Sequence, residues 1–343
     1  MKKKNLFNKI DKKVLIESLE KEPFDRITIS FYRYINIKYP IKFRDNLYKD
    51  WERLNIFGRV YISHEGINAQ ISIPKYHYQI FKEQLENKKE FKSIPIKHAL
   101  QDGASFYKLT IKVRKELVAY GLSPNNYDMD KTGNHLSARD YNKAIEDPDS
   151  IVIDMRNYYE SEIGRFDNAI IPNVETSKEL LPEVKRLLQN KKDKKILLYC
   201  TGGIRCEKAS SFLIKNGFKD VNQLEGGIIK YAHEIKRKGL QSKFKGKNFV
   251  FDNRLGERVT KDVLSCCHIC GNKCDSHNDC KNDACHILFI QCEKCYHELG
   301  GCCSKDCYEF SLLPKNEQKK LRKNPEKIVS KTFFDSRIKP RLN

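Results

Sequence analysis

The sequence predicts mixed α/β and α+β architecture in three modules: an α+β domain, a parallel α/β domain and a small cysteine-rich module. Strand and helix patterns alternate through residues 1–120, and a second series with buried strands starts near residue 137. Eleven of the 13 cysteines lie between Cys266 and Cys307. A chain of 343 residues is long enough for two or three domains. We therefore expect domains at 1–120 and 137–243, a linker at 121–136 and a C-terminal module at 244–343.

The first domain shows six elements in the order strand, helix, strand, strand, helix, strand. The strand at 27–35 is rich in β-branched and aromatic residues, and the helix at 42–54 places its apolar residues on one face. Strands at 58–63 and 67–73, a helix at 76–87 and a last strand at 106–113 complete the series. This order is the ferredoxin-like split unit. His64 and Glu65, at the hairpin tip, are either a catalytic pair or a solvent-facing turn.

The second domain shows short apolar strands that alternate with helices. Strands are expected at 151–155, 196–199 and 221–224, and helices at 179–189 and 206–216, where Gly217 ends the second helix. The polar segment at 121–136, with its proline and glycine, is expected to link the domains. This pattern predicts a parallel sheet with helices on its faces. Cys200 then lies at the carboxyl end of a strand, where open α/β sheets bind ligands.

The segment after the strand at 196–199 is suited to hold a charged sulfur atom. Gly202 and Gly203 let the backbone turn its N–H groups toward one point, and the positive end of the following helix faces the same point. Arg205 adds a permanent cation. Cys200 is therefore expected to ionise below its usual pKa of about 8.5 and to be reactive. The alternative is a buried structural cysteine beside a tight turn.

The spacing between Cys200 and Arg205 narrows the chemistry. Four residues separate them, one fewer than in the Cys-x5-Arg loop of cysteine phosphatases, so the loop suits one extra sulfur better than a phosphate. It resembles the active-site loop of rhodanese domains, whose cysteine carries a persulfide. Arg165 stands where that pattern usually has histidine. The resemblance implies Cys200 and Arg205 as catalytic residues, with a loop and supporting residues at Thr201, Gly202, Gly203, Ile204, Asp154, Arg156 and Glu160.

The C-terminal cysteines have the spacing of metal ligands. Two Cys-x2-Cys pairs, Cys267/Cys270 and Cys292/Cys295, have the separation that tetrahedral zinc requires, and a second site is expected from Cys280, Cys285, Cys303 and Cys307. A module so poor in apolar residues needs metal to fold. Structural zinc is the first hypothesis, and an iron–sulfur cluster or metal-free thiols are the alternatives.

The formal net charge of +20 indicates a polyanionic partner, and nucleic acid is the first candidate. A basic run at the C-terminus, which includes Lys319, Lys320, Arg322 and Lys323, and a second at 236–247 are typical of phosphate contacts. The alternative is that an AT-rich genome raised the lysine content. No stretch approaches 18 consecutive apolar residues and no secretory signal is visible, so we expect a cytoplasmic protein without a membrane span.

Four motifs together resemble the bacterial tRNA uridine hydroxylases of the TrhO family. They begin at Gly58 (GRVYISHEGINAQ), Cys200 (CTGGIRCEK), Phe249 (FVFDNR) and Cys280 (CKNDACH), and the resemblance covers nearly the full chain. It implies oxygen-dependent 5-hydroxylation of the wobble uridine of tRNA, with Cys200 as the active-site cysteine. Molecular oxygen and a reductant are the implied co-substrates. No Gly-x-Gly-x-x-Gly fingerprint for a flavin or nicotinamide cofactor is present.

Two further functions compete with the hydroxylase. The first is a rhodanese-type sulfurtransferase that uses a Cys200 persulfide, for example in tRNA thiolation, and the chemistry of the residues alone favours it. The second is a tRNA-binding adaptor without catalysis, which the intact Cys200 loop disfavours. The family resemblance favours the hydroxylase. The sequence leaves the oligomeric state open.

Overall fold

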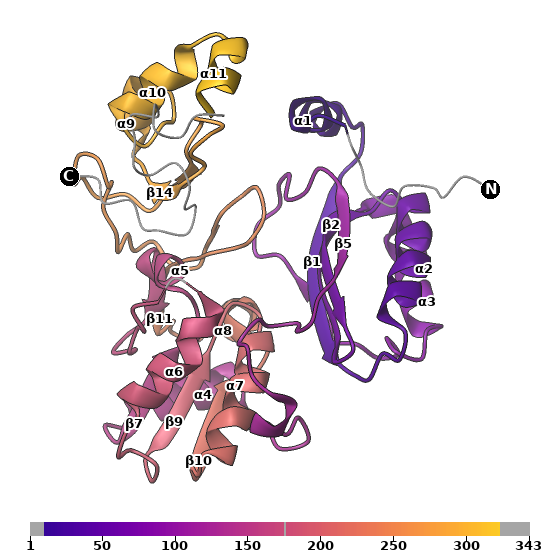
Figure 1. The fold of residues 1–343 in the computed structure, drawn as a ribbon. Coiled ribbons are helices and arrows are strands. Elements are labelled where there is room, and N and C mark those ends of the chain that lie inside the picture. The colour runs from indigo at the N-terminus through magenta and orange to yellow at the C-terminus, as the bar shows by residue number, and fades with distance from the viewer. Residues whose placement is uncertain (1–9, 175, 323–343) are drawn as a thin grey trace.

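The computed structural model describes residues 10–174 and 176–322, which form three modules (Figure 1). A helix that the sequence patterns did not indicate, α1 (Lys12–Glu20), precedes the first domain. That domain consists of β1 (Arg26–Tyr34), α2 (Pro40–Arg53), β2 (Phe57–Ser63), β3 (Gly66–Pro74), the 3-10 helix η1 (Lys75–His77), α3 (Tyr78–Glu86), β4 (Lys97–His98) and β5 (Leu109–Val113). The predicted α+β architecture is confirmed.

The position of the last strand differs from the expected one. The sheet order is β4-β1-β3-β2-β5, and the segment expected as the closing strand is β5, which pairs in parallel with β2 at the far edge. The place beside β1 belongs instead to the two-residue strand β4, which runs antiparallel to it. So short a strand has no periodic signal in the sequence. This correction places Lys97 at the edge of the sheet.

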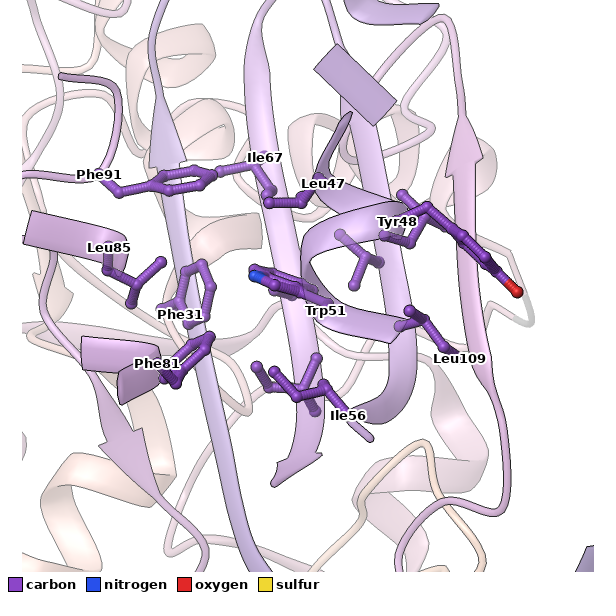
Figure 2. Close-up of a cluster of buried hydrophobic side chains, with 14 of the residues drawn as sticks. Phe31, Leu47, Tyr48, Trp51, Ile56, Ile67, Phe81, Leu85, Phe91 and Leu109 are labelled. Atoms are coloured by element: carbon purple, nitrogen blue, oxygen red, sulfur yellow. The ribbon is translucent and has the colours of Figure 1, made fainter. Parts of the chain in front are cut away.

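The core of the first domain lies on one face of this sheet. Helices α2 and α3 cover that face (Figure 1), and Phe31 of β1 packs edge-on against Trp51 of α2 with ring centroids 6.3 Å apart. Phe81 and Phe91 complete the aromatic cluster that Figure 2 shows. The opposite face carries polar side chains and is turned toward the second domain. We call it the open face of the sheet.

The second domain is the predicted parallel α/β unit. Its elements are β6 (Asn134–Leu136), α4 (Ala138–Glu146), β7 (Ser150–Asp154), α5 (Tyr158–Glu162), β8 (Gly164–Phe166), α6 (Ser177–Leu187), β9 (Lys195–Tyr199), α7 (Ile204–Lys215), β10 (Asp220–Leu224) and α8 (Gly227–Lys238). The parallel sheet has the order β6-β10-β9-β7. Val118 and Tyr120 already pack in its core, ahead of the short 3-10 helix η2 (Pro124–Asn126). The chain thus joins this domain's core before residue 121.

The cysteine-rich module contains β11 (Phe244–Asn248), β12 (Glu257–Arg258), β13 (His277–Asp279), β14 (Leu288–Ile290), α9 (Glu293–Glu298), α10 (Lys305–Leu312) and α11 (Lys315–Arg322). β11 pairs antiparallel with β8 and so joins the module to the second domain. Its small core is mostly cysteine, with Ile287 and Phe289. No helix within the described residues is long and apolar enough to cross a membrane.

Glu65 joins the first two domains. Its carboxylate lies 2.9 Å from the Lys208 amine of α7, a side chain with no exposed surface, and it accepts hydrogen bonds from the Leu117 N–H and the Tyr127 hydroxyl. His64 contacts the Ile37 carbonyl through Nδ1 at 3.1 Å. The interpretation of this hairpin tip as a solvent-facing turn therefore holds for His64, which is exposed, and is wrong for Glu65. A buried, paired lysine here fixes the first domain against the helix that follows Cys200.

Candidate active site and cysteine clusters

Cys200 lies at the carboxyl end of β9, as predicted, and the loop after it curls around its sulfur atom. The Gly203 N–H donates to Cys200 Sγ at 3.1 Å. Gly203 has a φ of 100°, a left-handed conformation that favours glycine, and it caps α7. The Ile228 N–H donates to the Cys200 carbonyl at 3.0 Å from behind. Backbone groups on both sides therefore fix the loop.

The surroundings of Cys200 favour its thiolate. Burial alone would raise the pKa of this thiol. The Cys206 side chain donates a hydrogen bond to it, Arg205 contributes positive charge, and the N–H groups of Cys206 and Gly203 add further bonds, so that its pKa falls to about 6. The sequence alone does not require the Cys206 side chain to face the sulfur, and this contact is seen only in the structure. Burial and the neighbouring Cys200 raise the pKa of Cys206, which therefore remains a donor.

Arg205 is held by a carboxylate rather than left free. Its guanidinium donates to both oxygens of Glu160, at 2.6 and 2.7 Å, and to the Thr201 hydroxyl at 3.3 Å. Glu160 in turn accepts from the Asn157 N–H at 3.0 Å as part of a capping box at the start of α5. The predicted catalytic arginine and the predicted support residue thus form one buried unit.

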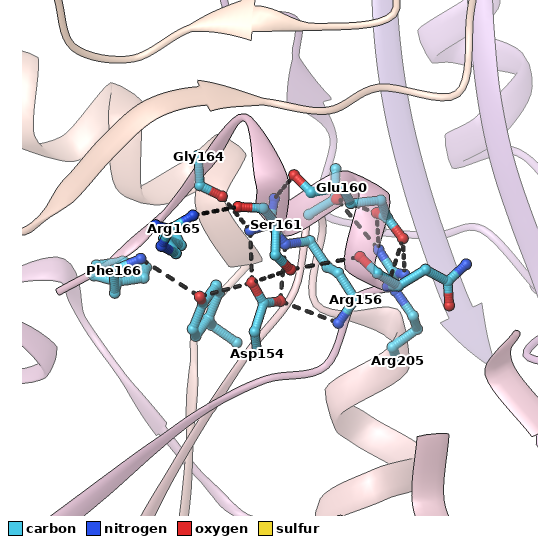
Figure 3. A network of polar contacts seen from close by, with 11 residues as sticks. Asp154, Arg156, Glu160, Ser161, Gly164, Arg165, Phe166 and Arg205 are labelled. Atoms are coloured by element: carbon cyan, nitrogen blue, oxygen red, sulfur yellow. Dashed lines mark hydrogen bonds and ion pairs between the residues drawn. The ribbon is translucent and has the colours of Figure 1, made fainter. Parts of the chain in front are cut away.

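A second buried ion pair supports this unit from below (Figure 3). Arg156 donates to both carboxylate oxygens of Asp154, at 2.9 and 2.7 Å, and to the Gly164 carbonyl at 2.6 Å. Asp154 also accepts from the hydroxyls of Ser161 and Tyr199, both at 2.7 Å. Such complete pairing offsets the cost of burying both charges. Asp154 and Arg156 therefore support the site from within the domain and do not line the cavity.

Arg165 does not reach the cavity beside Cys200. Its guanidinium donates to the Ser161 carbonyl at 3.3 Å, and its backbone lies in β8, paired with β11 (Figure 3). Arginine in place of the usual histidine therefore changes a contact with Ser161 of α5 and not a contact in the cavity. The entrance to the Cys200 loop is formed by other residues.

A cavity of about 440 Å³ separates the Cys200 loop from the open face of the N-terminal sheet. Small-molecule sites commonly measure roughly 300–1,000 Å³. Its walls come from all three modules, and they include Cys200, Thr201, Gly202, Ile204 and Arg205 of the loop. The facing wall includes Ser30, Tyr32, Arg59, Asn68, Gln70 and Lys97. Arg59, Asn68 and Gln70 belong to the motif that begins at Gly58, but the sequence did not indicate that they face Cys200, because this wall comes from four strands that only the folded sheet brings together.

Tyr32 links the two walls. Its hydroxyl donates to Glu207 of α7 at 2.8 Å and lies 2.7 Å from the point that a Cβ on Gly203 would occupy. His135 and Gln223 hold the same carboxylate, at 2.9 and 2.8 Å. No motif suggested these residues as parts of the site.

The C-terminal cysteines gather into the two predicted groups of four. Cys267, Cys270, Cys292 and Cys295 form one cluster, and Cys280, Cys285, Cys303 and Cys307 form the other, and within each the sulfur atoms lie within 4.8 Å of one another. Sulfur atoms lie 3.6 Å apart in the Cys270–Cys292 and Cys303–Cys307 pairs. A tetrahedral zinc with bonds of about 2.3 Å requires a separation of about 3.8 Å. Both clusters could therefore bind a metal ion.

The two basic runs differ in how many of their charges are already paired with carboxylates. Lys319 and Lys320 are exposed on α11, whereas Arg322 lies 3.6 Å from Asp283. Lys323 falls outside the described residues. In the other run, lysines 243, 245 and 247 each pair with a carboxylate, at 2.7, 3.0 and 2.8 Å, so this run carries less free charge than its sequence indicated.

Comparisons with known proteins agree with this architecture. Family models match at residues 4–117 (UPF0176 acylphosphatase like domain), 137–234 (Rhodanese-like domain) and 245–308 (Rhodanase C-terminal). A protein of Leptospira interrogans named tRNA uridine(34) hydroxylase is 50% identical over 100% of this chain and 93% of its own length. Proteins with the same name from Escherichia fergusonii and Photorhabdus laumondii are each 48% identical over 95% of this chain and 95% and 94% of their own lengths. With identity of this level along its whole length, the chain belongs to the tRNA uridine(34) hydroxylase family.

Proposed function

We propose that this protein hydroxylates carbon 5 of uridine 34, the wobble base of tRNA, in the cavity beside Cys200. Its relatives carry the name tRNA uridine(34) hydroxylase along the full chain. The observation that supports the site is a cysteine with a pKa of about 6 in the wall of a 440 Å³ cavity. A single flipped nucleotide is the kind of ligand such a pocket accepts.

The reaction needs two co-substrates beyond the RNA. Inserting one oxygen atom of O₂ into the C5–H bond leaves the second oxygen to become water, which consumes two electrons and two protons. A reductant must supply those electrons. Cys200 is the proposed reactive centre, as thiolate or persulfide, and Arg205 with Glu160 holds its loop. Cys200 and the open face of the sheet line the same cavity.

The test is nucleoside mass spectrometry of tRNA from a strain that lacks this gene. Loss of 5-hydroxyuridine derivatives, restored by the wild-type gene and not by Cys200→Ser, supports the proposal. Unchanged 5-hydroxyuridine in the deletion strain contradicts it, provided that no second hydroxylation route operates there. Removing dissolved oxygen from a reaction of purified protein, tRNA and an added reductant should stop hydroxylation.

A sulfurtransferase remains the second candidate, favoured by the four-residue spacing between Cys200 and Arg205. It predicts loss of thiouridines rather than hydroxyuridines in the same experiment. Incubation with a sulfane-sulfur donor such as thiosulfate, followed by intact-protein mass spectrometry, would detect one added sulfur on Cys200. Sulfur loading without any sulfur in tRNA would exclude tRNA thiolation as the outcome.

For the cysteine clusters we propose structural zinc, one ion in each. The sulfur separations and the burial of all four members of the Cys280 cluster support tetrahedral tetrathiolate sites. Elemental analysis of purified protein should find two equivalents of zinc. Iron with acid-labile sulfide instead would support the cluster alternative, and no metal in active protein would contradict both.

We also propose that exposed lysines carry tRNA binding. Lys319 and Lys320 of α11 are exposed and form no ion pair within the described residues, and the net charge of +20 supports an electrostatic contribution. A salt series of tRNA binding tests this, because each phosphate contact contributes a slope of about −0.7 to −0.9 on logarithmic axes.

A further inference from the structure

The open face of the N-terminal sheet presents an ordered row of polar side chains to Cys200. Residues that lie directly opposite one another on neighbouring strands point to the same side of a sheet. The register pairs Lys97 of β4 with Ser30 of β1, Ser30 with Gln70 of β3, and Gln70 with Arg59 of β2. All four line the 440 Å³ cavity that also contains Cys200. We call Lys97, Ser30 and Gln70 the polar row.

Lys97 is held over the active-site loop. Its ammonium nitrogen lies 4.5 Å from the centroid of the Tyr32 ring, a cation–π contact. Its Cε lies 3.8 Å from the point that a Cβ on Gly202 would occupy, so its stem crosses the loop at van der Waals distance. Tyr32 is itself fixed by Glu207. The amine is therefore positioned by its neighbours and not free to swing into solvent.

Lys97 differs from the other cations that line this cavity, because it is partly buried and no carboxylate neutralises it. Arg205 pairs with Glu160 and Arg254 with Asp252, whereas Arg59 and Arg114 form no ion pair within the described residues but are exposed. Among the described residues, no ion pair or hydrogen bond is recorded for the Lys97 amine. Burial lowers its pKa to about 8, although the charges of Cys200 and Glu207 oppose that change. At neutral pH, most copies of the protein therefore carry a charged, partly desolvated Lys97 amine that has no hydrogen-bond acceptor.

The remaining members of the polar row are also without partners. Among the described residues, no side-chain hydrogen bond is recorded for Ser30 or Gln70. A lysine ammonium is a donor only, a serine hydroxyl can accept, and a glutamine amide can donate. With the serine hydroxyl accepting and the glutamine amide donating, the row can present donor, acceptor and donor. The edge of uracil carries the complement: the acceptor O4, the donor N3–H and the acceptor O2.

From this match we propose that Lys97 is the residue that selects uracil, by donating to its O4 while Ser30 and Gln70 meet N3–H and O2. This inference rests on the proposed function. It assigns recognition of the substrate base to the polar row of the cavity. The base would lie between the open face of the sheet and the Cys200 loop.

The discriminating power of Lys97 follows from its lack of an acceptor. Cytosine carries an amino group where uracil has O4, so two donors would face each other and the ammonium would remain desolvated and unpaired. Buried donors that lose their partner are costly. One well-placed base-edge contact discriminates roughly 10- to 100-fold between bases. Adenine and guanine are larger and would have to displace the side chains of the row.

The test compares two anticodon stem-loop RNAs that differ only in uracil or cytosine at the wobble position. Dissociation constants are measured for wild type, Lys97→Met, Lys97→Arg and Lys89→Met. Lys97→Met keeps the stem and removes the donor, and Lys97→Arg restores a donor-only cation. Lys89 is an exposed lysine outside the cavity and serves as the matched control. Circular dichroism and thermal melting confirm that each variant is folded.

We expect wild type and Lys89→Met to prefer the uracil RNA about 10- to 100-fold. Lys97→Met should bind both RNAs within about twofold, mainly by losing the uracil RNA, and Lys97→Arg should recover part of the preference. An undiminished preference in folded Lys97→Met overturns the proposal, and so does a wild-type protein without any preference. Hydroxylation of the uracil RNA is measured in parallel, with oxygen and a reductant supplied. If it is absent while the binding ratios behave as expected, the proposed function fails and the recognition role stands.

Discussion

Glu160 accepts hydrogen bonds from both terminal nitrogens of Arg205, at 2.6 and 2.7 Å, and its side chain has no exposed surface. The arginine that borders the reactive sulfur is thus already paired with a carboxylate. Arg205 therefore has two effects at once: it orders the loop through Glu160, and its remaining positive field favours the Cys200 thiolate.

Replacing Arg205 with lysine should separate these effects. An ammonium cannot copy the planar pair of bonds, so the loop should loosen and the pKa of Cys200 should rise above 6. The pH dependence of Cys200 alkylation, followed by mass spectrometry, measures that pKa. Glu160→Gln is the informative partner variant, because it retains the Arg205 charge and should not raise the pKa. Its stability should fall by about 3–5 kcal/mol, the usual cost of leaving one buried charge unpaired.

Cys206→Ala should raise the pKa of Cys200, because the Cys206 thiol supplies one of the hydrogen bonds that stabilise the thiolate. Hydroxylation should decline at pH 7, and raising the pH should recover part of it. Cys200→Ser should abolish activity at every pH. Cys266→Ala, at an exposed cysteine outside both clusters, is the control and should leave the alkylation profile unchanged. Identical profiles for Cys206→Ala and wild type would mean that this hydrogen bond has no influence.

Metal removal should affect the two cysteine clusters unequally. Cys307 is fully buried with its three partners, whereas Cys270 is exposed. Cys307→Ser should therefore lose one equivalent of zinc and unfold the C-terminal module, while Cys270→Ser should lose one equivalent with a smaller drop in melting temperature. Zinc content per chain and differential scanning calorimetry are the measurements. Loss of both ions from Cys270→Ser would show that the clusters do not bind independently.

Neutralising the exposed lysines of α11 should weaken tRNA binding without touching the sulfur chemistry. Lys319→Gln with Lys320→Gln should reduce the slope of the salt dependence by about 1.4 to 1.8 if both contact phosphates. The double variant of lysines 243 and 245, which are already paired with Glu146 and Asp167, is the control and should change the slope less. Cys200 alkylation should stay the same in both, because screening limits such charges to about 10 Å. Lys323 extends the run beyond the described residues.

The preference for uracil over cytosine should depend on pH. The Lys97 pKa is lowered to about 8 by burial, against the opposing charges of Cys200 and Glu207 and with a small contribution from Lys230. The ammonium form dominates below pH 8 and is lost above it, so the ratio of dissociation constants should shrink between pH 7 and 9. Lys97→Arg should keep its ratio across this range, since arginine stays protonated. A wild-type ratio that is constant to pH 9.5 would contradict the role of Lys97.

The Cys200 loop could be predicted because its determinants are contiguous. Strand, cysteine, glycines, arginine and helix follow one another within about twenty residues, and each contributes a known local effect. The Cys-x2-Cys pairs share this property. The role of Cys206 could not be predicted, because a side chain in the first turn of a helix can point either way and its direction depends on how the preceding loop closes.

The other wall of the cavity could not be predicted, for the opposite reason. Lys97 lies in a strand of two residues, which has no periodic pattern. Its neighbours Ser30 and Gln70 are 40 positions apart in the sequence, and only the strand register places them side by side. The Glu65–Lys208 pair spans 143 positions and depends on how two domains pack. Sequence patterns report local structure, whereas these contacts are properties of the assembled molecule.

Because Gly203 has no side chain, the Tyr32 hydroxyl of the first domain can lie directly against the active-site loop of the second. The Tyr32 hydroxyl lies where an added methyl group would collide with it, at 2.7 Å, and Glu207 holds that hydroxyl in place. Any other residue at 203 would have to displace the Tyr32 hydroxyl from Glu207 and would also strain its own backbone. Tyr32 is a contact between the sheet and the helix after Cys200, and the Gly203 N–H is a donor to the sulfur. A substitution at this position would therefore disturb the link between the two walls of the cavity and the thiolate at the same time.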